Sequence, residues 1–343
     1  MPDFTLLDIQ QKNGSAVQRQ IVEDVIADTP TIKNLPAKVV DKVTFNFIRK
    51  VGIPRGRARA VNEGTNTAVT EYTRHTGNCG LYDTIITIDK ALADWVDTDV
   101  GNLMTDEAHN RIAGMMMSWE YQLYYGKHVE GKGFDGFNQQ IGDKMTISAD
   151  PAIDAAGTNT PGGMSVWLVR EKANDISLMF GKSRAISFGA ITEETTHDKL
   201  GKPYKVKTQD AHAWVGLAVM SETALGRIRN ISADHPLTDD LLAKAMMLFP
   251  SSGKPTKIYM NKAAGRLLQT SRTGTLKFVK GTSGSTTSAD WPTDYMGIPI
   301  EYTDGLISDE TEENIKAIAD ASMVYMEKNG TIDSREIIEA PTA

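Results

Sequence analysis

The sequence predicts an α+β protein built from more than one folded unit. A long segment, 105–126, carries apolar residues at helical spacing, and a basic segment before it lacks the apolar residues of a core. The segments after it first resemble strands and then alternate between helix and strand. The length of 343 residues exceeds what one hydrophobic core usually serves, so we expect two or more packed units.

Composition limits the class of protein. The chain is 40% hydrophobic and 24% charged, as in ordinary globular proteins, and no apolar run approaches the roughly 20 residues that span a bilayer. The N-terminus lacks the pattern of a signal peptide. Cys79 is the only cysteine, which excludes an intramolecular disulfide and a multi-cysteine zinc site and favours folding in a reducing cytoplasm. The net charge of −7 argues against a protein that grips nucleic acid over its whole surface.

The segment 105–126 is predicted to be one amphipathic helix. Thr105 is a suitable N-cap, and Gly126 can end the helix in a left-handed conformation. The polar residues fall on the other faces. The buried stripe is expected to comprise Ala108, Ile112, Met115, Met116, Trp119 and Leu123.

Residues 1–40 show no single periodic pattern of helix or strand. A short helix is possible at 18–27, and Pro30 and Pro36 interrupt any longer element. Such a segment does not make a core alone, so we expect an arm that lies across its own chain or a neighbour.

Residues 43–76 are predicted to form a long hairpin. Val43, Phe45 and Phe47 alternate with polar residues, 62–66 has turn chemistry, and 67–76 is again extended in character. Two strands of about 12 to 15 residues would reach roughly 40–50 Å. The outer half has too little apolar surface for a core and carries Arg49, Lys50, Arg55, Arg57 and Arg59. Ion pairing with another protein is the favoured interpretation of this cluster; phosphate binding, a solvated face and a disordered loop are the alternatives.

The region after the helix is rich in strand patterns. Phe134–Phe137 is expected to be a tight turn with two aromatic anchors. Ser221 is expected to cap a short helical turn that carries Leu225 and Ile228. Strands are expected at 165–169, 185–188, 204–208 and 213–220.

A second, smaller α/β unit is expected from about residue 233. Thr238 and Asn261 are predicted helix caps, with a strand at 257–260 between the two helices. A loop is expected at 281–288 and an edge strand at 297–302. The chain then turns acidic at 309–313, and 336–340 is strand-like.

No motif assembles an active site. Gly181-Lys182-Ser183 lacks the upstream glycine of a phosphate-binding loop, and the segment beginning at Asp97 has Ala108 where a calcium loop needs glutamate. Cys79 is expected to be a structural thiol. The six histidines lack metal-ligand spacing, and structural or surface roles are expected for His75, His109, His128, His197, His212 and His235. We therefore predict no catalytic residue, cofactor or metal.

The order and spacing of several segments resemble the major capsid proteins of tailed bacteriophages, which have the Hong Kong 97-type fold. The resemblance spans about residues 40–310, and no single motif is diagnostic. The matching segments are 62–64 at the hairpin tip, 89–94, 123–126, 134–137, 165–170, 214–219, 227–231, 258–261 and 297–300.

The resemblance implies a structural protein and a domain plan. It implies an N-terminal arm (1–40), an extended hairpin loop (41–85), a peripheral domain (86–232) with a spine helix (105–126), an axial domain (233–310) and a C-terminal segment (311–343). Strands at 165–232 would complete the peripheral sheet. Neighbouring subunits would be contacted through Arg49, Lys50, Arg55, Arg57, Arg59, Glu63 and Arg74.

The resemblance also implies partners. The chain would assemble with itself as hexamers and pentamers in the host bacterial cytoplasm and become the virion shell around double-stranded DNA, without sequence-specific binding or a membrane. A separate scaffolding protein is expected, because the chain shows no long N-terminal scaffold segment, together with a portal and a possible decoration protein. An encapsulin-type compartment, which shares the fold, and a cytoplasmic α/β enzyme are the rival interpretations.

Overall fold

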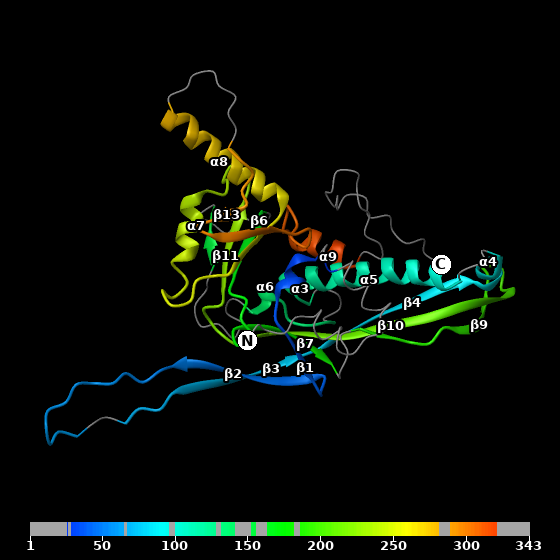
Figure 1. Ribbon diagram of the computed structural model, residues 1–343, viewed down its shortest axis with the longest axis horizontal. Helices are drawn as coiled ribbons and strands as arrows, with labels where there is room; N and C mark the ends of the chain where they lie inside the picture. Colours follow the sequence, from blue (N-terminus) through cyan, green and yellow to red (C-terminus); the bar gives the residue numbers. More distant parts are fainter. Residues whose placement is uncertain are drawn as a thin grey trace.

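The computed structural model describes residues 26, 29–64, 67–95, 100–127, 132–140, 152–155, 163–181, 186–280 and 289–320. These form an elongated molecule with a hairpin projecting from one end (Figure 1). A long sheet with a helix along it occupies the other end, and a smaller α/β unit lies beside them. The strands belong to two six-stranded sheets and a separate two-stranded ribbon.

The first sheet is organised around one long strand, β10 (Pro203–Val219). The strands predicted at 204–208 and 213–220 are both part of it. Four strands of this sheet, at 37–40, 80–89, 176–181 and 192–197, were not predicted; the last of them, Thr192–His197, has no large apolar residue to mark it. Beside β10 lie β4 (Gly80–Asp89), β7 (Ile176–Gly181), β8 (Ser187–Phe188) and β9 (Thr192–His197), and β1 (Ala37–Val40) pairs in parallel with β7.

Helix α5 (Val100–Tyr125) covers one face of this sheet and confirms the predicted amphipathic helix. It begins before Thr105, so the predicted N-cap is wrong. Met104 is 1% exposed and extends the apolar stripe one turn further. Gly126 has φ +77° and ends the helix as predicted. The short helix α4 (Lys90–Trp95) precedes it.

The stripe of α5 is the centre of the larger core. All six predicted stripe residues are buried there. The Trp119 ring meets Tyr82 of β4 edge-on, with centroids 5.9 Å apart, and the ring of Phe180 in β7 lies 6.1 Å away. Phe134 and Phe137 are buried beside the same helix, which confirms them as anchors; Phe137 begins α6 (Phe137–Gln140).

The second sheet, with α7 (Asp239–Met246) and α8 (Lys262–Lys280), forms the α/β unit. Thr238 accepts a hydrogen bond from the Leu241 amide and Asn261 from the Ala264 amide, so both predicted caps are confirmed. The strand order is β13 (Asp294–Tyr295), β14 (Ile298–Tyr302), β12 (Lys257–Met260), β6 (Met164–Val169), β11 (Leu225–Ile231) and β5 (Ala152–Asp154).

Two predictions about this region were wrong. The segment after Ser221 is not a helical turn, because Leu225–Ile231 is strand β11. The strand predicted at 165–169, which is β6, was expected to join the later strands up to residue 232 in one peripheral sheet, yet β6 pairs with β12 and β11 of the second sheet. Val166, Leu168 and Ile228 supply the core of the α/β unit. Strand β4, which pairs with β10 along its length, runs through residue 85, where the resemblance sets the limit between hairpin loop and peripheral domain.

Two short segments carry the chain between the sheets, from β6 to β7 and from β10 to β11. Arg170, 7% exposed, joins them. Its Nε donates to Asp175 Oδ2 at 2.6 Å and its Nη2 to Ser221 Oγ at 3.0 Å. Its Nη1 donates to the carbonyl of Gly253, in the loop after α7, at 3.1 Å. Hydrogen bonds from one guanidinium therefore link these two connecting segments to each other and to the loop after α7.

The ends of the described chain lie across α5. Ile32, in α3 (Pro30–Asn34), and Leu35 are buried in the core with the α5 stripe, so this part of residues 1–40 packs on its own chain. The Tyr121 hydroxyl donates to the carbonyl of Ile315 in α9 (Glu312–Asp320) at 2.9 Å. The predicted helix at 18–27 apart from Ile26, the loop at 281–288 and the strand at 336–340 lie outside the described residues.

Glu120 is a buried carboxylate on α5, 2% exposed, which the pattern analysis missed. The Thr31 amide donates to its Oε1 at 2.9 Å, and Tyr124 shares a 2.6 Å hydrogen bond with the Thr31 hydroxyl. Burial raises the pKa of Glu120 to about 7, although hydrogen bonds from Thr31 and Thr303 lower it. Glu120 thus joins α3, the spine helix and the end of β14.

Replacing Glu120 by Gln should remove a pH dependence. Because the folded chain binds this proton more tightly than the unfolded chain, the free energy of unfolding falls as the pH rises from 4.5 to about 7. Relative to wild type, Glu120→Gln should gain up to roughly 3 kcal/mol at pH 8 and little at pH 5. Urea unfolding at both pH values measures this, with the exposed-face variant Glu107→Gln as the charge control; equal gains at both would contradict it.

Trp119→Ala tests the α5 stripe. The variant leaves a cavity between Tyr82 and Phe180, and loss of a buried Trp typically costs about 3–5 kcal/mol. Thermal unfolding of the isolated subunit should show a large drop in midpoint. Ser118→Ala, on the exposed side of the same helix, is the control and should change the midpoint little. A stable Trp119→Ala subunit would show that the core lies elsewhere.

Candidate assembly surface

The ribbon of β2 (Thr44–Gly52) and β3 (Glu71–Asn78) is anchored at its base and free beyond it. Phe45 and Phe47 point inward and pack with Met179 and Ala218 on the face of the first sheet opposite to α5. The approach is close, because a Cβ added at Gly216 would lie 2.9 Å from the Phe45 ring. The predicted half-buried alternation is therefore confirmed for Phe45 and Phe47 but not for Val43, which is 48% exposed and precedes β2.

Arg49 departs from the predicted contact set. Its side chain lies on the same face of β2 as the two phenylalanines, and the residue is 0% exposed. The guanidinium donates to the carbonyl of Val219 at the end of β10. Burial lowers the pKa of Arg49, and the nearby Glu222 partly opposes this. Arg49 fastens the ribbon to its own subunit, so it is not an exposed cation as expected.

The other cations of the set are exposed. Lys50 and Arg74 lie on the outer face of the ribbon, beside Ile48 and Tyr72, which are 60% and 61% exposed. Beyond the strands, 53–64 and 67–70 continue without strand pairing. This outer part, which we call the hairpin arm (residues 53–64 and 67–70), carries three exposed arginines, Arg55, Arg57 and Arg59, and three exposed aliphatic residues, Ile53, Val61 and Val69.

Glu63 shapes the tip of the arm. Its Oε2 accepts a hydrogen bond from the Ala60 amide at 2.8 Å, and its own amide donates to the Ala60 carbonyl at 3.2 Å. Arg59 donates to the Glu63 carbonyl at 2.6 Å. Asn62, with φ +70°, occupies the left-handed position that the turn requires. The predicted contact residue Glu63 thus has a role within its own chain as well.

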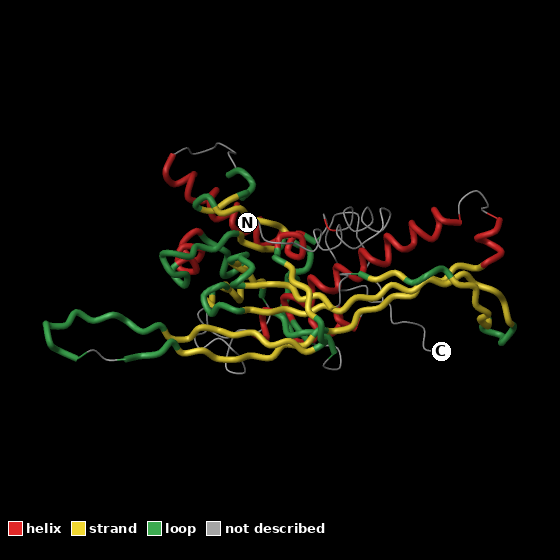
Figure 2. The backbone as a smooth tube through the Cα atoms, turned by 60° about the horizontal axis from the view of Figure 1, so that its bottom comes forward, coloured by secondary structure: helices red, strands yellow, loops and turns green. Residues whose placement is uncertain are grey.

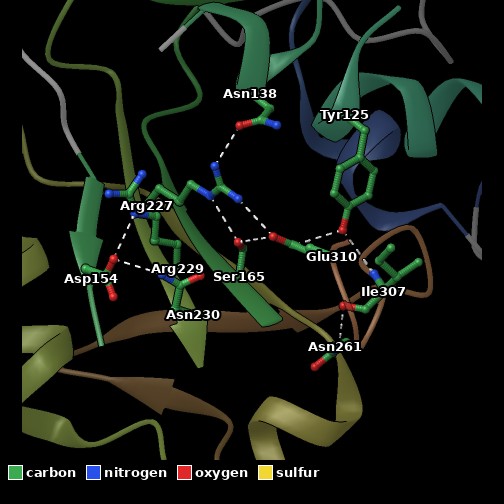
Figure 3. Close-up of polar contacts among 10 residues, drawn as sticks. All are labelled: Tyr125, Asn138, Asp154, Ser165, Arg227, Arg229, Asn230, Asn261, Ile307 and Glu310. Atoms are coloured by element: carbon green, nitrogen blue, oxygen red, sulfur yellow. Dashed lines mark hydrogen bonds and ion pairs between the residues drawn. The ribbon is translucent and has the colours of Figure 1, made fainter. Parts of the chain in front are cut away.

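A buried polar cluster, shown in Figure 3, joins the α/β unit to the spine helix. Arg227 of β11 donates from Nη2 to Glu310 Oε2 at 2.8 Å and from Nη1 to Asn138 Oδ1 at 2.6 Å. Ser165 donates to Glu310 at 2.5 Å, and the Tyr125 hydroxyl donates to the same carboxylate at 2.9 Å. These residues were not predicted, because the partners are far apart in the chain and Glu310 sits in an acidic run that suggests a solvated segment.

The cluster has the chemistry of a structural joint. Arg227 and Glu310 side chains are 13% and 6% exposed, and each finds several partners, which offsets the cost of burying charge. The Ser165 hydroxyl is bonded to a carboxylate and to Arg227 and has no histidine base among its contacts. Neighbouring Asp154 pairs with Arg229 and Asn230 in the same way.

Cys79 and His75, two of the side chains considered for chemistry, pack within the structure. Cys79 is buried, and burial raises the pKa of its thiol to about 11, which keeps it protonated. His75 packs on Phe47 with ring centroids 5.6 Å apart, whereas His128 lies outside the described residues. In the described parts of the chain, no group of three or more His, Cys, Asp or Glu residues is placed to hold a metal ion. No helix within those parts is long and apolar enough to cross a membrane.

Comparisons with known proteins agree with this geometry. A chain of the bacteriophage Epsilon15 structure superposes with a TM-score of 0.56 at 18% identity, covering 80% of this chain and 87% of that one. A chain of the bacteriophage JBD30 capsid gives a TM-score of 0.50 at 11% identity, covering 78% and 88%. These likenesses show the fold, which is the Hong Kong 97-type capsid fold. No curated protein matches the sequence.

The family is shown by the sequence itself. Residues 12–314, well over half of the chain, match the family described as Major capsid protein GP7. The match favours a phage shell over an encapsulin-type compartment and places the subunit in the virion capsid. This chain belongs to the major capsid protein GP7 family, and it is a structural subunit of a tailed-phage capsid shell rather than an enzyme.

Proposed function

We propose that the chain builds the shell as hexamers and pentamers, with the hairpin arm lying on a neighbouring subunit. One observation carries the proposal: every described residue from Ile53 to Val69 is exposed, although the arm holds aliphatic side chains as well as arginines. A two-stranded ribbon is marginal in water, so its outer part needs a surface to rest on. A neighbouring subunit supplies that surface when the shell forms.

The free energies expected for the contacts of the arm describe an interaction that is weak in one subunit pair and becomes stabilising when many copies form it. An exposed ion pair contributes about 0–1 kcal/mol, and each buried aliphatic side chain about 1.5–3 kcal/mol. Arg55, Arg57, Arg59, Lys50 and Arg74 with the three aliphatic residues of the arm give one modest contact per subunit. Repetition around the shell makes the assembly stable while single contacts stay reversible during assembly.

We propose corresponding roles for the two sheets. The first sheet with α5 forms the peripheral domain, and the second sheet with α7 and α8 forms the axial domain around the five- and six-fold positions. The unit built on the second sheet includes β5, β6 and β11, so its limits differ from 233–310.

We further propose the partners of the shell. Assembly takes place in the host cytoplasm with a separate scaffolding protein, a portal and a decoration protein. The shell encloses double-stranded DNA without reading its sequence. The net charge of −7 supports this role, because a strongly basic wall would hold DNA too tightly for release.

Reversing the arginines tests the arm. Arg55→Glu/Arg57→Glu/Arg59→Glu should leave the subunit folded and strongly reduce the yield of shells. Arg55→Lys/Arg57→Lys/Arg59→Lys keeps the charge and should assemble nearly as wild type. Velocity sedimentation and negative-stain microscopy measure assembly, and circular dichroism measures folding. Normal assembly of the Glu variant, or unfolding of its subunit, would contradict the proposal.

The aliphatic side chains of the arm give a second test. Ile53→Ser/Val69→Ser should lower shell stability towards urea and leave the melting of the isolated subunit unchanged, since both side chains are exposed there at 74% and 85%. Thr67→Ser/Thr70→Ser, in the same segment, is the control. Equal urea resistance of both shells would show that the arm buries no apolar surface.

A further inference from the structure

Helix α3 is a short element whose form depends on its contact with α5 (Figure 1). Ile32 and Leu35 are 1% and 0% exposed and belong to the core with the α5 stripe. A helix of five residues is not stable in water on its own, so α3 keeps its form only while it is docked. Docking and undocking of α3 are therefore one local event.

Polar contacts hold both ends of α3. The Thr31 amide donates to Glu120 Oε1 at 2.9 Å, and the Thr31 hydroxyl shares a 2.6 Å hydrogen bond with Tyr124. At the other end, Asn34 Nδ2 donates to the hydroxyl of Tyr259 in β12 at 3.2 Å. The first contact involves a carboxyl group that can gain or lose a proton.

The docking of α3 positions the chain that leads into the ribbon. Strand β1 follows α3 and pairs with β7. Its Ala37 belongs to the core with α5, whereas its Val40 packs with Phe45 and Phe47 under the ribbon. The ribbon then extends away from the rest of the molecule as an isolated pair of strands (Figure 2). A change at α3 thus acts on the segment from which the ribbon starts.

Glu120 is enclosed between α3 and the end of β14. The Thr303 side chain forms a second hydrogen bond with its carboxyl group. A Cβ added at Gly305 would lie 2.9 Å from Glu120 Cγ, so the backbone after β14 packs closely on this side chain. Thr31, 0% exposed, completes the enclosure. Water therefore gains access to the carboxyl group when α3 moves away.

The surroundings of Glu120 favour its neutral form. Burial raises the pKa of its carboxyl group to about 7, and Asp304 adds to this effect although the hydrogen bonds oppose it. Asp304 Oδ1 itself lies 3.6 Å from Lys262 Nζ. Tyr124 stays uncharged, because burial raises the pKa of its hydroxyl well above the ordinary value. Lys33, the one charged residue of α3, is exposed.

We propose that docking of α3 on α5 is coupled to protonation of Glu120, so that α3 stays docked while the carboxyl group is neutral and detaches more often once it is ionised. In the docked state α3 keeps water from the carboxyl group, whereas in the detached state water solvates the carboxylate. Detachment therefore releases a proton. The inference goes beyond the proposed function, because it concerns a movement within the folded subunit.

Detachment should become more frequent as the pH rises. The pKa of Glu120 is raised from 4.5 to about 7 in the docked state, so this group stabilises docking below pH 4.5 and loses that contribution as the pH rises through about 7. With an ordinary pKa in the detached state, the opening constant of α3 should rise by up to roughly 70-fold between pH 5 and pH 8.

Native-state hydrogen exchange of the full-length subunit tests the coupling. The amides of Thr31, Lys33 and Leu35 report on α3, and those of Lys33 and Leu35 donate within this segment at 3.1 Å. After correction for the chemical exchange rate at each pH, their opening constant should show the expected rise. It should depend little on low urea concentrations, because opening of α3 exposes little surface.

The amides of β10 that pair with β7 provide the internal reference. They should exchange through global unfolding and depend steeply on urea. An α3 opening constant that does not change with pH would overturn the inference. One that follows urea as steeply as the β10 amides would also overturn it, because α3 would then open only with the whole fold.

Two matched variants assign the proton to its residue. Glu120→Gln keeps the shape of the neutral group and cannot ionise, so the opening constant of α3 should no longer rise with pH. Glu171→Gln is the control: burial raises the pKa of Glu171 to about 7 as well, but this residue reaches α3 through Tyr259. It should retain the rise. The opposite pattern, or loss of the rise in both variants, would overturn the assignment.

The wild-type profile needs no variant, so the coupling stays testable if Glu120→Gln does not fold. In that case Glu171→Gln is compared with the wild-type chain alone. A rise retained in Glu171→Gln supports Glu120 as the titrating group, and loss of the rise there would transfer the role to Glu171 and overturn the inference.

Discussion

The burial of the α5 stripe against β10 and its neighbours is the constraint on which the rest of the structure depends. A long helix with one apolar side needs a long apolar surface, and the first sheet supplies one through a strand that spans nearly its whole length. Trp119 fills the middle of this contact, between β4 and β7. Because α5 takes one face of the sheet, the ribbon must use the other face, and the second sheet must build its own core.

Many elements of this fold could be predicted from local patterns in the sequence. The helix, the aromatic anchors and the caps at Thr238 and Asn261 depend on neighbours in the chain, and all were predicted correctly. The sheet assignment of β6 failed because strand patterns carry no information about which sheet a strand joins. Strand β9 was missed because its side chains are polar and its place comes from pairing with β10.

The assembly surface shows the same limit. The basic character of the arm was evident, but Arg49 was grouped with it on charge alone. Its position two residues after Phe47 continues the buried alternation and was the signal that it faces inward. For Arg227 and Glu310 no such signal existed, since neither local spacing nor charge pattern links residues so far apart. Long-range pairing of buried charges is decided by the fold.

The hydrogen bonds of Arg170 affect how the two sheets can move relative to each other. Two connections between the sheets, from β6 to β7 and from β10 to β11, pass this residue, and the loop after α7 is bonded to it too. A change in the angle between the two sheets would therefore disturb the hydrogen bonds of this guanidinium and those of the Glu310 carboxylate. Side-chain hydrogen bonds, as well as the chain itself, thus hold the two units together in a building block that must fit positions of different curvature.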